Sequence, residues 1–236
     1  MEPAVVRRTR WVVRCVANDR TVSRVIEYVA GVLQCRVPDV YYQPDKPGGL
    51  LLANCVDGDD VIPSLVVRAD ILNMPSRRVL AFAVGRMLAL MRPEHYLRLA
   101  LATKTERKVA LLSAVKLVAP EFPVPPDLRA GVAQYLPAMQ RHVSPSMHEQ
   151  LGHVVTRLIA AAPELHVDAW DRGADATARR AGFVVSGDLA AAAAVIATEP
   201  TGVGDPGAKQ KTMDLVAYSV SEDYFALRDQ LGLTVA

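Results

Sequence analysis

Apolar residues in the first third of the chain follow two different periods. A helical period, with apolar side chains three or four positions apart, follows a capping residue at Thr21 and is carried by Val22, Val25, Ile26, Val29, Val32 and Leu33. Short apolar runs then occur at 37–42, 48–54 and 61–67, separated by prolines, a glycine pair and a polar turn. Runs of this length between turn residues predict three strands.

From residue 73 the pattern is helical almost to the end of the chain. The apolar spacing predicts helices at about 77–91, 105–118, 126–139, 145–161, 164–184, 188–197, 207–218 and 221–231. Capping residues support three of the helix starts: Ser144 followed by Pro145, Asp188, and Ser219 with Glu222 as a capping box.

A helix, a small sheet and many helices, in that order, predict an α+β fold that is mostly helical. We expect a small antiparallel or mixed sheet near the N-terminus, packed on a helical core. A single domain over 1–236 can bury a substantial core, with 1–20 as an N-terminal segment and 201–236 as a C-terminal helical extension. The proline-rich run 120–126 holds Phe122 and Val124, so we expect a packed surface crossing there and no domain boundary.

Charge and composition narrow the possible partners. The 27 Lys and Arg residues against 25 Asp and Glu leave a net charge of +2 without a sustained basic run, which argues against nucleic-acid binding. The longest apolar stretches fall short of the roughly 20 residues that cross a bilayer. The three cysteines are an odd number, which is typical of a reducing compartment. We therefore expect a cytoplasmic protein with no membrane partner.

One segment, "HEQLGH", is close to the zinc-peptidase signature H-E-x-x-H. The signature places its histidines four residues apart, on one helix face, whereas His148 and His153 are five apart. On a regular helix their side chains point about 140° away from each other, and only a rare π-bulge would bring them together. We expect a solvated helix here that holds no metal.

Arg86 stands out because it lies in the middle of the apolar segment from Val79 to Met91. This segment is apolar on nearly every face, so we expect it to run through the middle of the domain. An isolated buried guanidinium costs several kcal/mol. Arg86 must therefore reach a carboxylate or carbonyls, or point along a cleft to water.

Around this helix the chain resembles the HtpX-like zinc metallopeptidases, the compact gluzincins. The resemblance rests on "VPDVYYQPDKPGGLLLANC", "VVRADIL", "NMPSRR", "VLAFAVGRMLALMRPEH" and the later "DATARRAGFVVSGDLAAAAAVI", and covers roughly residues 20–95 and 165–200. It implies a lone helix, a small sheet and an active-site helix on a zincin-like core.

The family's two histidine ligands fall on Gly85 and Ala89, and its catalytic glutamate falls on Arg86. Its third ligand, a glutamate, falls on Asp175, and the supporting aspartate falls on Arg179. Glycine and alanine have no donor atoms and arginine does not act as a base, so the resemblance implies a degenerate site with no metal and no cofactor. We expect Arg86 to pair with Asp175 and bridge the two helices in place of the metal. The alternative is that Arg86 reaches solvent.

The resemblance therefore implies a catalytically inactive, pseudopeptidase-like domain that binds or scaffolds proteins. It further implies a larger bacterial assembly, with a tetratricopeptide-repeat region as a possible partner. An extended peptide along a sheet edge is the expected binding mode. The candidate edge strand lies around 50–54, and the binding residues expected are Leu51, Leu52, Ala53, Asn54 and Arg86.

Two enzymatic alternatives stay open. One is an active zinc hydrolase that uses His148, Glu149 and His153, with His142 or His166 completing the ligand set. The other is a non-metal enzyme in the vestigial cleft, where Arg86 binds an anionic ligand. The sequence offers no nucleophile with a neighbouring base for the second alternative.

Overall fold

A computed structural model describes residues 5–7, 20–57, 60–74, 76–101, 103–162, 166–199 and 206–233. The chain divides into two compact units, one made of 1–100 with 172–236 and the other of 101–171. Most of the N-terminal segment and residues 201–205 of the C-terminal extension lie outside the described residues, as does Cys15. The expectation of a single folding domain stays a prediction.

The sheet of the first unit is mixed, within the range that the sequence predicts. Its strands are β1 (Val5–Arg7), β2 (Asp39–Gln43), β3 (Leu50–Asp57) and β4 (Asp60–Arg68), in the order β1-β3-β4-β2. Strand β4 pairs antiparallel with β3 and parallel with β2, and β1 pairs parallel with β3. The three strands expected from the apolar runs are present, and β1 is an additional strand that the apolar pattern does not mark.

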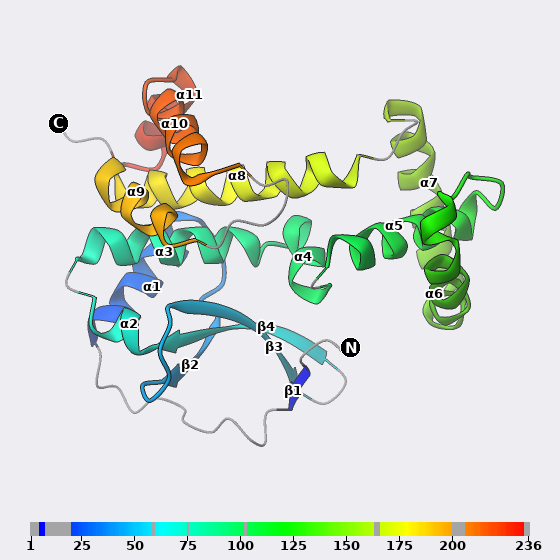
Figure 1. Ribbon diagram of the computed structural model, residues 1–236, viewed down its shortest axis with the longest axis horizontal. Helices are drawn as coiled ribbons and strands as arrows, with labels where there is room; N and C mark the ends of the chain where they lie inside the picture. The colour runs from blue at the N-terminus through cyan, green and yellow to red at the C-terminus, as the bar shows by residue number, and fades with distance from the viewer. Residues whose placement is uncertain are drawn as a thin grey trace. The chain divides into compact units, whose positions relative to one another are not determined.

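Helices make up most of the rest of the first unit. They are α1 (Arg20–Val32), α2 (Ala69–Leu72), α3 (Arg77–Leu90), α4 (Leu97–Ala100), α9 (Leu189–Ala197), α10 (Ala208–Ser219) and α11 (Glu222–Gln230). Helix α8 (Val167–Ser186) begins in the second unit and continues into the first. In Figure 1, α3 lies between the sheet and α8. The described chain is thus a mostly helical α+β fold.

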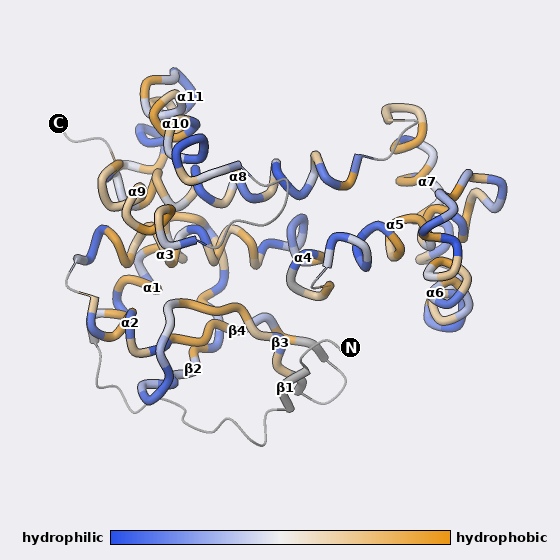
Figure 2. Tube along the Cα trace, in the orientation of Figure 1, coloured by the Kyte–Doolittle hydropathy of each residue, from blue (hydrophilic) through white to orange (hydrophobic). Residues whose placement is uncertain are grey.

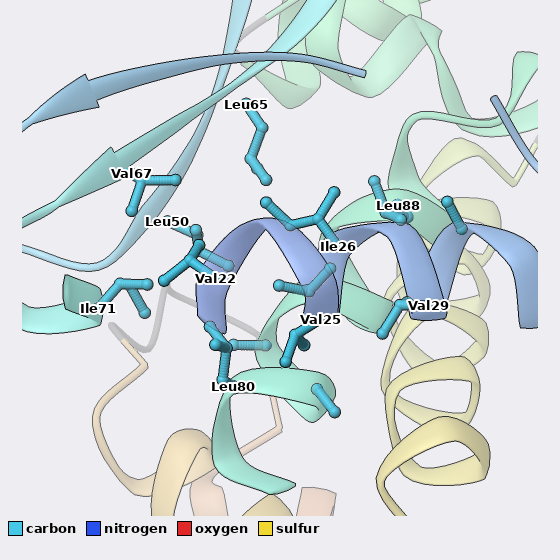
Figure 3. Close-up of a cluster of buried hydrophobic side chains, with 14 of the residues drawn as sticks. Val22, Val25, Ile26, Val29, Leu50, Leu65, Val67, Ile71, Leu80 and Leu88 are labelled. Atoms are coloured by element: carbon cyan, nitrogen blue, oxygen red, sulfur yellow. The ribbon is translucent and has the colours of Figure 1, made fainter. Parts of the chain in front are cut away.

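The main core of the first unit lies between the sheet, α1 and α3. Figure 3 shows Val22, Ile26 and Val29 of α1 among residues from β3, β4 and α3. Burial of this many aliphatic side chains is the main source of stability for such a layered arrangement. Figure 2 shows hydrophobic positions concentrated along β3, β4 and α3, while α3 begins with a hydrophilic stretch at Arg77 and Arg78. The helix expected from its apolar pattern to run through the middle is indeed buried along most of its length.

The second unit is a small helical assembly. It contains α5 (Lys104–Val118), α6 (Arg129–His142), α7 (Pro145–Ala161) and the first turn of α8. Phe122 and Val124 pack against Val109, Leu112, Leu128 and Val132. The proline-rich run is therefore a packed crossing inside this unit, as predicted.

Two of the four predicted helix caps are confirmed. Ser144 accepts a hydrogen bond from the Met147 amide, and Asp188 accepts one from the Ala191 amide. The Ser219 cap is wrong: α10 continues to Ser219, and Ser221 caps α11 instead. Thr21 is not a cap either, because α1 already begins at Arg20. In the described part of the chain, no helix is long and apolar enough to cross a membrane.

Candidate functional site

Helices α3 and α8 cross at two glycines. A Cβ atom on Gly182 would lie 2.6 Å from the carbonyl oxygen of Phe82 and 3.3 Å from the amide nitrogen of Arg86. A Cβ atom on Gly85 would lie 2.9 Å from the Cα of Gly182 and 2.7 Å from a methyl group of Val185. Distances below 3 Å to backbone atoms are too short for any side chain, so the two helices approach as closely as they do only because both residues are glycine.

This crossing gives Gly85 a structural role at the position where the resemblance places a histidine ligand. A histidine there would have to push α8 away, because its Cβ alone collides with the α8 backbone. The second ligand position, Ala89, is also buried, and its carbonyl oxygen lies 2.9 Å from Nδ1 of His95. Both positions are therefore occupied by packing contacts that differ from those of a metal site.

Arg86 has a dedicated acidic partner, but the partner is Glu199 and not Asp175. The Nη1 atom of Arg86 lies 2.8 Å from Oε1 of Glu199, and Lys211 Nζ donates to Oε2 of the same carboxylate at 2.8 Å. The Glu199 and Lys211 side chains are 7% and 8% exposed. Asp175 instead receives two hydrogen bonds from Arg98, at 2.6 and 3.1 Å. The predicted Arg86–Asp175 bridge is wrong because each charge has another partner in reach.

Arg179 lies in the middle of these charges. It is 5% exposed, and among the described residues it has neither a hydrogen bond nor an ion pair, while its buried Nε has no acceptor. Burial lowers the pKa of Arg179 most strongly; the charges of Asp175, Glu199 and Asp214 oppose that shift and the charge of Arg86 adds to it. The net direction is downward, so the neighbouring carboxylates only partly replace the lost water.

A small cavity lies beside the C-terminal end of α3. It has a volume of about 190 Å³, and its lining includes Cys35, Ala89, His95 and Thr177. The presence of a thiol and an imidazole raises the question of a nucleophile with its base. Burial raises the pKa of Cys35, which favours the unreactive thiol over the thiolate. Nothing at this cavity supports the non-metal enzyme.

The "HEQLGH" segment lies on α7, which is a regular helix from Pro145 to Ala161. His148 and His153 are exposed, and Nε2 of His148 lies 3.1 Å from the carbonyl oxygen of Leu117. Across the described residues, no three His, Cys, Asp or Glu side chains come together as metal ligands. The zinc-hydrolase alternative therefore has no structural observation in its favour.

The candidate edge strand, β3, is partly covered. Its Asn54 pairs with Val5 of β1, while Leu51, Leu52 and Ala53 pair with β4 on the other side. Leu51 is 40% exposed, and Leu52 packs against the main core. Leu51 and Leu52 therefore lie on opposite faces of the sheet. Arg86 pairs with Glu199, as described above, and binding at the five residues stays a prediction.

Sequence patterns did not mark several residues of this charged site. No local sequence pattern marks Glu199 or Lys211 as part of a site. Glu199 pairs with Arg86, which lies more than a hundred positions earlier in the chain, and Lys211 pairs with Glu199. Arg98 likewise meets Asp175 across 77 positions. The only available signal was the unmatched arginine itself, which requires a partner without identifying it.

Comparison with known proteins adds no relative. No protein-family model matches the chain, and none of the curated proteins or solved structures does. The fold and the site define a mostly helical α+β protein in which an arginine, a glutamate and a lysine form a buried ionic network beside a glycine crossing.

Proposed function

We propose that the chain is a catalytically inactive, metallopeptidase-like domain that binds a protein partner. The observation that carries this proposal is the Gly85–Gly182 crossing, with the Arg86–Glu199–Lys211 network beside it. At the positions where the resemblance places two ligands and a general base, the chain has a glycine, an alanine and an arginine. A guanidinium does not serve as a general base, so an arginine at this position cannot activate water.

The Arg86–Glu199–Lys211 network would help the fold to stay stable without a metal. A divalent cation in a peptidase site links two helices through its ligands. Here Glu199, which follows α9, links Arg86 of α3 to Lys211 of α10 by charge-assisted contacts of 2.8 Å. This link needs no metal; it joins α3 to α10, whereas the metal of the resemblance would join α3 to α8.

The proposal is tested by the metal content of the purified protein. We expect zinc well below one equivalent, no change in melting temperature on adding zinc or a chelator, and no cleavage of unfolded casein in the presence of zinc. The matched variants are His148→Ala, which removes a ligand of the alternative site, and His95→Ala, which removes the histidine nearest Ala89. Stoichiometric zinc that is lost in His148→Ala would establish the zinc hydrolase instead.

The partner would bind as an extended segment along β3. Strand β1 pairs with Asn54, Cys55 and Val56, so an added segment would lie along 50–53, where the described structure has a strand partner only on the β4 side. Leu51 would provide an exposed apolar contact next to that position. A bacterial cytoplasmic assembly with tetratricopeptide repeats remains the proposed setting.

The binding mode is tested with peptides selected against the purified protein from a display library. Leu51→Asp should weaken binding at least about tenfold, because it places a charge in an apolar contact that becomes buried, at a cost of more than 1.4 kcal/mol. Val220→Asp is the matched control, since Val220 is an exposed apolar residue at the end of α10. Equal affinity of the two variants would contradict binding along β3.

A further inference from the structure

Arg179 is a buried cation whose charge is not matched by a partner. Only 5% of the residue is exposed, and no hydrogen bond or ion pair reaches its guanidinium from the rest of the described structure. Buried guanidinium groups in folded proteins are almost always paired, because losing water costs several kcal/mol per charge. An arginine in this state points to a counter-ion that binds from outside the chain.

The charged residues around Arg179 also include more cations than carboxylates. Arg86, Arg179 and Lys211 provide three cations, and Glu199 is the only carboxylate in contact with two of them. Asp175 and Asp214 are also close enough to influence Arg179, but each one has its own arginine, Arg98 and Arg180 respectively. Whether or not these two outer pairs are counted, the described cluster has two more cations than carboxylates.

Both arginines have an unused donor of the kind that an oxyanion accepts from. The Nε atoms of both Arg86 and Arg179 are buried without an acceptor. A guanidinium presents its donors as a planar fork that matches the two oxygens of a carboxylate or of a phosphate. The Arg86 side chain is 19% exposed, so the cluster is in contact with solvent on that side.

We propose that Arg179, together with Arg86 and Lys211, forms a binding site for a small oxyanion that carries a carboxylate or phosphate group. The ligand neutralises the positive excess and accepts hydrogen bonds from the guanidinium groups. This site is independent of the proposed binding along β3 and of the absence of catalysis. If the oxyanion site fails its test, the proposed partner binding along β3 is unaffected, and the reverse also holds.

The test measures the melting temperature in phosphate and in acetate, each against chloride at the same ionic strength. The wild-type protein should gain roughly 5–10 °C at an anion concentration a hundredfold above Kd. Arg179→Met should lose this gain, and in chloride it should melt at the same temperature as the wild type or higher, because it removes an unmatched buried charge. A gain in phosphate alone would assign the site to phosphate groups, and a gain in acetate alone would assign it to carboxylates.

Two matched variants keep the result interpretable. Arg157→Met removes an exposed arginine of α7 and should keep the full anion response. Arg179→Lys keeps the charge without the planar fork and should keep a reduced response. The proposal is overturned if phosphate and acetate act no differently from chloride, or if Arg179→Met responds like the wild type, which would indicate surface binding only. It is also overturned if Arg179→Met melts well below the wild type in chloride, because the neighbouring carboxylates would then already neutralise Arg179.

Discussion

Arg107 in the second unit and Arg179 in the first are equally buried, each 5% exposed, yet their charges are met in different ways. Arg107 donates to Asp171 at 2.6 Å and to the carbonyl oxygen of Leu101 at 2.7 Å. Arg179 has no such bond among the described residues, and the carboxylates near it are bound to other cations. Burial of an arginine therefore says little about its role until the carboxylates around it are assigned.

Helix α8 contributes to both arrangements, with Asp171 in one and Arg179 in the other. The Arg107–Asp171 pair matches one cation with one carboxylate, so it leaves little net charge to attract a ligand. The cluster around Arg179 shares Glu199 between two cations, so removing one member changes the balance for the others. This difference suggests that the two sites respond differently when a carboxylate is lost.

Glu199→Gln should have the largest effect, destabilising the protein by about 5 kcal/mol, because two buried cations lose their shared carboxylate. Asp171→Asn should cost about 3–4 kcal/mol, because one buried cation, Arg107, loses its carboxylate. Urea denaturation measures both values. Equal costs would show that the cluster behaves as a simple pair.

Rescue by a second substitution sharpens the same comparison. Arg107→Met in the Asp171→Asn background should recover most of the lost stability, because the unmatched charge is gone. Lys211→Met in the Glu199→Gln background should recover only part of it, since Arg86 and Arg179 stay charged. Asp168→Asn is the control on α8: its pair with Lys108 is 45% and 34% exposed at the two side chains, so the cost should be below about 1 kcal/mol.

The sequence predicted most of the fold because local signals determine most element boundaries. Helix α7 begins and ends where expected, since Ser144 and Pro145 form a strong start signal. The cap of α11 was misplaced because two serines, two positions apart, both precede the helix, and α10 extends through the first of them. The strand β1 was missed because three residues, Val5–Arg7, give too short a pattern.

The site was predictable only in part. Arg86 was recognised as needing a partner, because a charge in an apolar helix always does. Its partner could not be derived, because Glu199 follows a separate helix and tertiary packing alone brings the two together. The packing role of Gly85 was also missed. In the sequence, a glycine inside a helix indicates only a lost ligand or a weak helix former, and its contact with Gly182 arises from the tertiary packing.

Gly182→Ala should have an intermediate effect on the free energy of unfolding. It tests whether the glycine crossing or the ionic network holds α3 against α8. Its new methyl group would lie 2.6 Å from the Phe82 carbonyl oxygen, so the helices must separate, at a net cost of about 2 kcal/mol. Gly173→Ala is the matched control on the same helix, because no atom lies within 4 Å of its new methyl group. That variant should gain up to about 1 kcal/mol from helix propensity. A harmless Gly182→Ala would mean that the crossing is loose and that the ionic network alone positions the helices.

Asp188 is the partly exposed counterpart of the buried pairs and should have the smallest effect. It caps α9 and lies 3.3 Å from Arg78, whose side chain is 70% exposed. The hydrogen bond from the Ala191 amide, followed by the one from Arg78, lowers the pKa of Asp188. A lowered pKa in the folded state means that the stabilisation is complete above the ordinary value of about 4 and is lost as the pH falls further.

Asp188→Ala should therefore cost about 1 kcal/mol at pH 7 through loss of the cap. Asp188→Asn should cost only a few tenths of a kcal/mol, because asparagine caps helices nearly as well. The difference in melting temperature between the wild type and Asp188→Asn should shrink as the pH is lowered from 6 to about 2, since protonation removes the charge that asparagine lacks. A difference that stays constant over this range would mean that the carboxylate acts only as a neutral cap, and that pairing with the exposed Arg78 contributes nothing.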